Sequence, residues 1–181
     1  MPSLVGSEMC IRDSWEDIGT IESFYKANLA FAGPNPPLDL FSPDWMIYTR
    51  PRFLPPSKLQ DCKIENALIA DGCQIRGCTI KNSVIGIRTV IREGTTVEDS
   101  IVMGADYYIP EPKRSRTIPV IGIGKGVVIR KAIVDKNVRI GNRVRIVNEK
   151  NIRNADGPGW SIRDGIVVVE KNAVIPAGTV I

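Results

Sequence analysis

The stretch from Asp61 to Val102 reads DCKIENALIADGCQIRGCTIKNSVIGIRTVIREGTTVEDSIV, and β-branched residues recur in it about every five or six positions. The recurring residues are Ile64, Ile69, Ile75, Ile80, Ile85, Val90, Val97 and Ile101. Glycines and asparagines, which tolerate the positive φ of tight corners, stand between them. One apolar residue in six is too sparse for an amphipathic helix, and this hexapeptide spacing predicts a parallel β-helix.

Two later blocks continue the pattern. The first block holds Ile133, Val138 and Val144. The second block holds Ile162, Val168, Val174 and Val180, which are spaced by six residues throughout. We expect one short strand on each side of a triangular coil, with coils stacked about 4.8 Å apart. Hexapeptide repeats wind left-handed, an exception to the right-handed crossover rule. We expect insertions at about 103–122 and 148–161 to protrude as loops.

A different pattern precedes the repeats. Thr20 is a suitable N-cap, and Ile21, Phe24, Tyr25 and Leu29 follow at helical spacing, which predicts a short amphipathic helix. Residues 33–60 are rich in proline, so they predict an extended linker, and residues 61–181 form the predicted β-helix domain.

The first fourteen residues show no such periodicity. Met9-Cys10-Ile11-Arg12-Asp13-Ser14 is the translation of ATG-TGT-ATA-AGA-GAC-AGN, which resembles a transposon mosaic end used in sequencing libraries. The segment also lacks the charged start and long apolar run of a secretory signal. We therefore expect residues 1–14 to be an artefact, and natural sequence to begin near Trp15, inside a longer protein.

Composition excludes several kinds of chemistry. The chain has no histidine, which removes the usual base of hexapeptide-repeat acyltransferases and the zinc ligands of a β-helical carbonic anhydrase. Beyond Cys10, the cysteines are Cys62, Cys73 and Cys78, which lack the close pairs of a zinc or redox motif. We expect them to be reduced thiols in a core. No apolar run has the length of a membrane span, so we expect no membrane partner.

Two basic or glycine-rich stretches have simple interpretations. Gly122-Ile123-Gly124-Lys125-Gly126 lacks the Gly-Lys-Ser/Thr ending of a phosphate loop, so we expect glycines at the entry to a coil. Lys113-Arg114-Ser115-Arg116 has no interleaved aromatic residues for base stacking. It predicts a solvated loop, and we expect no nucleic-acid partner.

Four motifs together resemble one family. They are Trp15-Glu16-Asp17-Ile18-Gly19-Thr20, the segment Tyr48–Pro56 with Pro51-Arg52-Phe53-Leu54-Pro55-Pro56, Met103-Gly104-Ala105-Asp106-Tyr107-Tyr108, and Ile133-Val134-Asp135-Lys136-Asn137. In this order they resemble glucose-1-phosphate adenylyltransferase, also called ADP-glucose pyrophosphorylase, from Trp15 to Ile181. The resemblance implies that residues 15–32 end a catalytic α/β nucleotidyltransferase domain, and that the β-helix regulates and oligomerises the enzyme.

The resemblance also implies a reaction. The intact enzyme would convert ATP and glucose 1-phosphate into ADP-glucose and pyrophosphate for glycogen or starch synthesis, with Mg²⁺ as cofactor. It would be a homo- or heterotetramer in the cytoplasm, or in a plastid if the source is a plant or alga. The nucleotide loop and sugar pocket would lie in the missing N-terminal domain, so we expect this chain alone to be inactive. Asp17 matches an aspartate that helps to hold Mg²⁺ in the family.

Three cations match an effector site in the same family. Asp135-Lys136-Asn137-Val138 and Glu170-Lys171-Asn172-Ala173 are near-copies, which places both lysines at coil corners. Spacing alone would leave corner lysines facing water. In the plant and cyanobacterial branch, the matching lysines bind the phosphate and carboxylate of an activator, typically 3-phosphoglycerate, and inorganic phosphate inhibits. Arg52 matches an arginine of that anion pocket. The resemblance thus implies that Arg52, Lys136 and Lys171 converge on one phosphorylated metabolite.

Some alternatives remain open at this stage. The 148–161 segment is shorter than in the plant-type pattern and carries Gly157-Pro158-Gly159-Trp160, which leaves the effector's identity open. The chain could also be the β-helix tail of another sugar-phosphate nucleotidyltransferase, such as a mannose-1-phosphate guanylyltransferase, or a non-catalytic hexapeptide-repeat binding module. The linker motif and the paired Lys-Asn corners favour the first interpretation.

Overall fold

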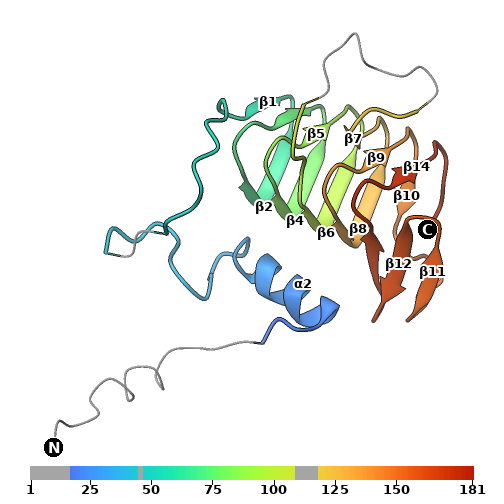
Figure 1. The fold of residues 1–181 in the computed structure, drawn as a ribbon, viewed down its shortest axis with the longest axis horizontal. Coiled ribbons are helices and arrows are strands. Elements are labelled where there is room, and N and C mark those ends of the chain that lie inside the picture. The colour runs from blue at the N-terminus through green and yellow to red at the C-terminus, as the bar shows by residue number, and fades with distance from the viewer. Residues whose placement is uncertain (1–16, 45–46, 109–117) are drawn as a thin grey trace, which may run out of the picture.

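The computed structural model describes residues 17–44, 47–108 and 118–181. Figure 1 shows the helix α2 beside a stack of coils through which the chain advances from β1 toward the C-terminus. The interpretations of residues 1–14, of Trp15 and of the basic run at 113–116 fall outside the described residues.

The predicted helix is present as α2, Ile21–Ala30. Thr20 caps it as expected: its side-chain oxygen accepts a hydrogen bond from the backbone N–H of Ser23, and the Ser23 hydroxyl oxygen accepts one from the Thr20 N–H. This reciprocal capping box satisfies two of the N–H groups that would otherwise be unpaired at the helix start. Local sequence alone therefore defines where α2 begins.

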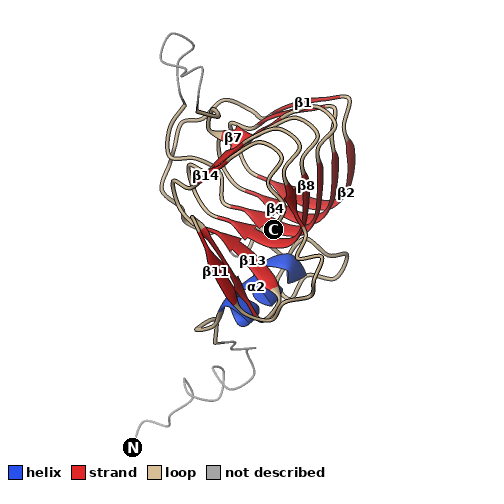
Figure 2. Cartoon of the chain, turned by 90° about the vertical axis from the view of Figure 1, so that its right-hand side faces the viewer, coloured by secondary structure: helices blue, strands red, loops and turns tan. Residues whose placement is uncertain are grey.

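The strands form two sheets, which are sides of the triangular coil seen end-on in Figure 2. The first sheet has the order β1-β3-β5-β7-β9-β14, and the second has the order β11-β12-β13-β8-β6-β4-β2, with β10 pairing β8. Their bounds are β1 Lys58–Gln60, β2 Lys63–Ile69, β3 Gln74–Arg76, β4 Thr79–Ile85, β5 Val90–Ile91, β6 Thr96–Val102, β7 Gly122–Ile123, β8 Val128–Val134, β9 Arg139–Ile140, β10 Arg145–Ile146, β11 Ala155–Gly157, β12 Trp160–Arg163, β13 Ile166–Val169 and β14 Val174–Ile175. All pairings are parallel except those of β11 with β12 and of β12 with β13.

Three ladders of aliphatic side chains fill the inside of the coil. In register they are Leu59-Ile75-Ile91-Ile123-Ile140-Ile175, Ile64-Ile80-Val97-Ile129-Ile146, and Ile69-Ile85-Val102-Val134-Val169. Beyond the first member of each ladder, every one of these residues is buried. Burying each side chain contributes roughly 1.5–3 kcal/mol, so the ladders hold the coils in register. The predicted left-handed parallel β-helix is confirmed.

In the last block the predicted inward position is correct at Ile162 and wrong by one residue from Val168 onward. Val174 and Val180 are 43% and 56% exposed, whereas their neighbours Ile175 and Ile181 are 1% and 9% exposed. Val168, Val174 and Val180 are each followed by an apolar residue, so the six-residue spacing is equally well satisfied one residue further on. Only stacking on the preceding coil decides between the two.

A second apolar cluster lies outside the coil, under α2. Ile101, Ile133 and Ile166 are buried there against Phe24, Tyr25 and Leu29 of the helix. Ile101 and Ile133 were expected among the inward repeats, but the adjacent residues Val102 and Val134 point inward instead. The Tyr25 hydroxyl also donates to the Asp99 carbonyl oxygen at 2.5 Å, which ties α2 to β6.

Two stretches that were predicted to be irregular contain strands in the structure. β1 lies inside the stretch assigned to the linker, because Lys58–Gln60 pair with Gln74–Arg76 despite the preceding prolines. The insertion expected as a loop at 148–161 instead contains β11 and the start of β12, which form an antiparallel hairpin extending the second sheet. Trp160 opens β12 and packs against the coil's core.

The three described cysteines are free thiols, as expected. Cys73 and Cys78 are buried and Cys62 is partly buried. Cys78 Sγ lies 3.7 Å from Cys62 Sγ on the adjacent coil. The described part of the chain holds no helix with the length and apolarity that a membrane crossing needs.

Candidate anion site at a coil corner

One corner of the coil is a continuous backbone ladder, which we call the corner column. Its rungs are N–H···O bonds from Gly72 to Pro55, Arg88 to Asp71, Ala105 to Ile87, Asn137 to Gly104 and Asn172 to Lys136, at 2.9, 3.2, 2.9, 3.0 and 2.9 Å. The chain turns there with positive φ at Gly72, Arg88, Gly104, Asn137 and Asn172. Asparagine adopts this conformation more readily than most residues, which explains the repeated Lys-Asn pair. Lys136 and Lys171 therefore occupy equivalent positions on adjacent coils.

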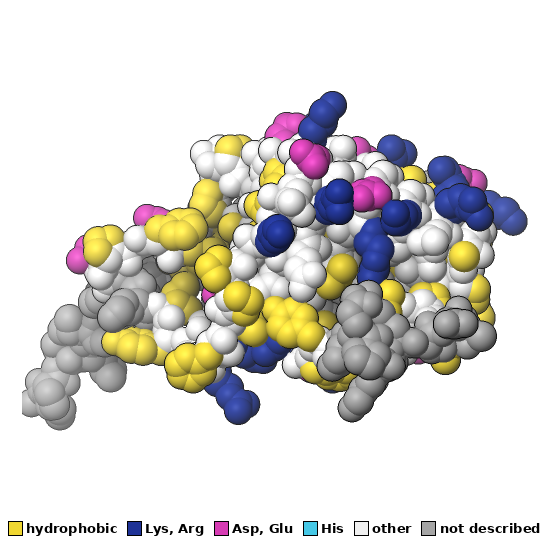
Figure 3. Space-filling model, turned by 90° about the horizontal axis from the view of Figure 1, so that it is seen from above, with side chains coloured by type: hydrophobic (Ala, Val, Ile, Leu, Met, Phe, Trp, Pro, Cys, Tyr) yellow, Lys and Arg dark blue, Asp and Glu magenta, His cyan; other side chains and the backbone are white. Residues whose placement is uncertain are grey.

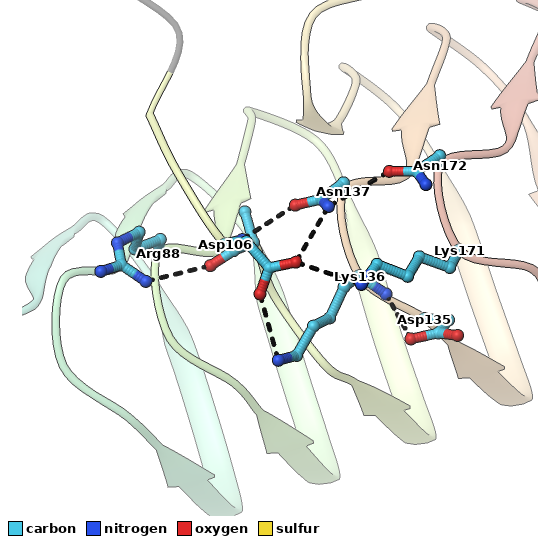
Figure 4. Close-up of polar contacts among 8 residues, drawn as sticks. Arg88, Asp106, Asp135, Lys136, Asn137, Lys171 and Asn172 are labelled. Atoms are coloured by element: carbon cyan, nitrogen blue, oxygen red, sulfur yellow. Dashed lines mark hydrogen bonds and ion pairs between the residues drawn. The ribbon is translucent and has the colours of Figure 1, made fainter. Parts of the chain in front are cut away.

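The two lysines meet at one carboxylate. Lys136 Nζ lies 3.2 Å from Asp106 Oδ1, and Lys171 Nζ lies 3.3 Å from Asp106 Oδ2 (Figure 4). Asn137 completes the cluster, since its Nδ2 donates to Asp106 Oδ2 at 3.1 Å and its Oδ1 accepts from the Asp106 N–H at 2.8 Å. The predicted convergence of Lys136 and Lys171 is thus present in the structure.

The cluster strongly favours the ionised carboxyl group. Hydrogen bonds from Lys136 and then Asn137 lower the pKa of Asp106 from 3.8 to about 2; burial opposes this, and the Lys171 hydrogen bond adds a smaller lowering effect. Asn137 Nδ2 also donates to Asn172 Oδ1 at 3.2 Å, which links the corner amides of the two coils. These amides orient the site, because each asparagine side chain is held by its neighbour.

The segment that carries Asp106 is held on both sides. The Arg88 guanidinium donates from Nη1 to the Ala105 carbonyl oxygen at 3.3 Å, and it lies 5.8 Å from the centre of the Tyr108 ring. The Tyr108 hydroxyl in turn donates to the Gly72 carbonyl oxygen at 2.8 Å. Tyr107 and Tyr108 help to line a separate pocket of about 470 Å³, to which neither lysine contributes.

The structure does not bring Arg52 to the lysines. Its side chain is exposed, and no contact within the described residues joins it to Lys136 or Lys171. Arg52 precedes Pro55 at the first rung of the corner column, and four rungs separate Pro55 from Asn137. At roughly 4.8 Å per coil this is about 19 Å. The candidate site in the described residues therefore consists of the two lysines, and a role for Arg52 stays a prediction for the intact protein.

The described residues do not build a magnesium site around Asp17. Asp17 is exposed, and its Oδ1 accepts the Gly19 N–H at 2.9 Å. No group of three Asp, Glu, Cys or His side chains that could hold a metal occurs in the described ranges. Mg²⁺ requires near-octahedral oxygen ligation, so this carboxylate alone does not fit the ion and supports no catalytic step here.

The glycine-rich segment at 122–126 is structural, as expected. Gly122 and Ile123 form β7, Gly126 turns with positive φ, and Lys125 pairs with Glu93 at 3.1 Å. On the face shown in Figure 3, Lys and Arg side chains are interspersed with Asp and Glu side chains. Among the described residues, ion pairs join Lys125 to Glu93, Arg130 to Glu98, Arg145 to Glu149 and Arg153 to Asp164. These four ion pairs offset part of the positive charge of this region.

The sequence indicated no role for Asp106 in the site, and it indicated only a turn position for Asn137 and Asn172. Asp106 lies 30 positions from Lys136 and 65 from Lys171, and only the stacking of coils brings the three together. The available signal was the repeated Lys-Asn corner. In such a stack, the corner of the preceding coil can present an acidic side chain to the lysines. Here that side chain is Asp106, which follows Gly104.

The fold and the corner site define a hexapeptide-repeat protein whose parallel β-helix carries a paired-lysine corner. A family model described as the GLGC left-handed parallel beta-helix domain matches residues 52–180, well over half of the chain. The chain therefore belongs to this family. The match supports the C-terminal part of the ADP-glucose pyrophosphorylase family, a nucleotidyltransferase family, as the source of the β-helix.

Proposed function

We propose that this chain is the C-terminal, regulatory piece of a glucose-1-phosphate adenylyltransferase subunit, and that Lys136 and Lys171 bind a phosphorylated effector. The observation that carries the proposal is the convergence of both ammonium groups on one carboxylate, at 3.2 and 3.3 Å. Two cations held on one bidentate anion are arranged to bind a phosphate as well.

The family match supports the enzymatic part of the proposal. The β-helix covers nearly all of the matched range, and α2 packs on it through Ile101, Ile133 and Ile166. Such a helix would couple the β-helix to the catalytic domain of which it is the last element. The intact enzyme would use ATP, glucose 1-phosphate and Mg²⁺ to make ADP-glucose and pyrophosphate, and it would be a tetramer.

The lysines can act only as effector ligands in this scheme. They lie on the corner column, whereas Asp17 is the only residue here that matches a catalytic position of the family. An effector bound at the corner would act through a coupling free energy between two sites, so it would change activity without touching the substrates.

Calorimetric titration of the whole chain with 3-phosphoglycerate tests the effector site. We expect saturable binding to the wild type, and a loss of about tenfold or more in affinity with Lys136→Ala or Lys171→Ala, as for a charge-assisted hydrogen bond. Lys150→Ala is the matched control, because Lys150 is an exposed lysine outside the corner column. Binding that survives both corner variants, or that falls equally with Lys150→Ala, would contradict the proposal.

A further inference from the structure

Asp106 already places an anion between the two lysines. Each carboxylate oxygen contacts one ammonium group, and Oδ2 also accepts from Asn137 Nδ2. A carboxylate presents its oxygens as a fork, as two oxygens of a phosphate do. The contacts that we propose for the effector are therefore made, in this structure, by the chain itself.

We infer that Asp106 is an internal competitor for the paired-lysine site, so that the site admits a phosphate dianion and rejects singly charged anions. This inference rests on the proposed function, because it assumes that the lysines bind an external anion. It adds a residue that sets which anions bind and how tightly.

The backbone near Asp106 is held by hydrogen bonds, whereas its carboxylate is held only by side chains and is partly exposed to water. The Ala105 N–H donates to the Ile87 carbonyl oxygen at 2.9 Å, and the Asp106 N–H donates to Asn137 Oδ1 at 2.8 Å. The Asp106 side chain is nevertheless 35% exposed. Rotation about its side-chain bonds can thus transfer the carboxylate to water without opening the corner.

The lysines cannot hold both anions side by side. A phosphate placed between them would lie within a few ångströms of the Asp106 carboxylate, and like charges at that distance repel strongly where water is partly excluded. The Asp135 carboxylate, which accepts the Lys136 N–H at 2.6 Å, adds further negative charge nearby. Binding therefore requires exchange of one anion for the other.

The exchange favours a dianion. A tethered carboxylate competes at a high effective concentration, so a free monoanion with the same charge gains nothing over it. A dianion gains about twice the Coulomb attraction to the same two ammonium groups. The low pKa of Asp106, about 2, keeps the competitor charged at every pH where phosphate is a dianion.

Titration of the whole chain with inorganic phosphate, and separately with acetate, tests the inference. Asp106→Asn keeps the size of the side chain and an acceptor for Asn137 but removes the charge. We expect this variant to bind phosphate roughly tenfold more tightly than the wild type, which is the size of effect expected from one hydrogen bond to a charged group. We also expect it to gain measurable acetate binding. Asp156→Asn is the matched control, because Asp156 pairs with Arg163 in the hairpin, and it should leave phosphate affinity unchanged.

The outcomes separate the inference from the proposed function. Tighter phosphate binding by Asp106→Asn that is lost with Lys136→Ala or Lys171→Ala supports both. Lysine-dependent binding that is equal or weaker in Asp106→Asn overturns the inference, because Asp106 would then only position the lysines, and leaves the proposed function standing. Failure of the wild type and Asp106→Asn to bind phosphate, or binding that ignores the lysines, overturns both.

A second measurement covers the case in which Asp106→Asn does not fold. In the wild-type chain, the carboxyl ¹³C resonance of Asp106 should move toward that of a free aspartate as phosphate saturates the lysines. An unchanged Asp106 resonance at phosphate saturation would overturn the competition.

Discussion

Lys136 and Lys171 sit at the same corner of adjacent coils, where the Asn172 N–H donates to the Lys136 carbonyl oxygen at 2.9 Å. Their ammonium groups reach opposite oxygens of the Asp106 carboxylate. Identical corner turns thus place two cations at one point, although 35 residues separate them in the sequence.

Replacing Gly104 should disturb the corner that presents Asp106. Gly104 has φ of +87°, and an added Cβ would overlap the Ile87 carbonyl oxygen, so we expect Gly104→Ala to cost about 2–4 kcal/mol of folding stability. Gly178→Ala is the control, because Gly178 has φ of +76° but nothing lies near its Cβ position. It should cost only about 1 kcal/mol. Equal losses in chemical denaturation would show that the close approach at Gly104 is unimportant.

The Tyr25 hydroxyl should stabilise the docking of α2. It donates to the Asp99 carbonyl oxygen, and Tyr25→Phe should cost about 1 kcal/mol at pH 8. Tyr48→Phe is the control, since Tyr48 is 88% exposed. Denaturant unfolding of the three chains measures the difference, and equal stability of all three would refute this role.

That contribution should also depend on pH. Burial, and then the Asp99 charge, raise the pKa of Tyr25 from 10.0 to about 12. Because the folded-state pKa lies above the unfolded one, the stability is fully present below pH 10 and is lost as the pH rises through 12. The gap in stability between wild type and Tyr25→Phe should therefore narrow from pH 8 to pH 11. A constant gap would mean that Tyr25 ionises as readily folded as unfolded.

Cys73 and Cys78 should resist alkylation in the folded chain. Burial, and then the neighbouring Cys62 thiol, raise the pKa of Cys78 from 9.0 to about 12, and burial raises that of Cys73. Since the thiolate is the reactive form, iodoacetamide at pH 8 should modify the partly buried Cys62 first. Peptide mass spectrometry before and after denaturation measures this order. Labelling of Cys78 at the same rate in both states would contradict it.

The chain alone should not synthesise ADP-glucose. Its described residues hold no group of three metal-binding side chains, and Asp17 is a single exposed carboxylate. We expect no turnover above background with ATP, glucose 1-phosphate and Mg²⁺. Turnover that Asp17→Asn abolishes would show that a complete active site is present after all.

Periodicity predicted the coil because each strand needs one inward aliphatic residue, as Ile80 and Ile129 illustrate. It failed where neighbouring residues are both apolar, as at Val174 and Ile175, because spacing cannot choose between adjacent positions. It also could not show that Ile101 and Ile133 face outward, since that depends on α2 covering them.

The same limit applies to the site. The repeated Lys-Asn pairs predicted that Lys136 and Lys171 lie at coil corners. Their convergence was implied by the family resemblance, since spacing alone would leave corner lysines facing water. Asp106 is the partner of the lysines because its corner lies one coil before the corner of Lys136. The insertion between these two corners in the sequence hides the fact that they are neighbours. Arg52 lies on the linker, whose course over the coils no repeat specifies.

The most direct test of the paired-lysine site is a crystal structure of the chain grown with saturating inorganic phosphate. We expect tetrahedral density in contact with both Lys136 Nζ and Lys171 Nζ, with the Asp106 carboxylate turned toward solvent, and no such density in Lys171→Ala crystals. Asp106 still bound to both lysines at saturating phosphate, with any phosphate elsewhere, would contradict the site.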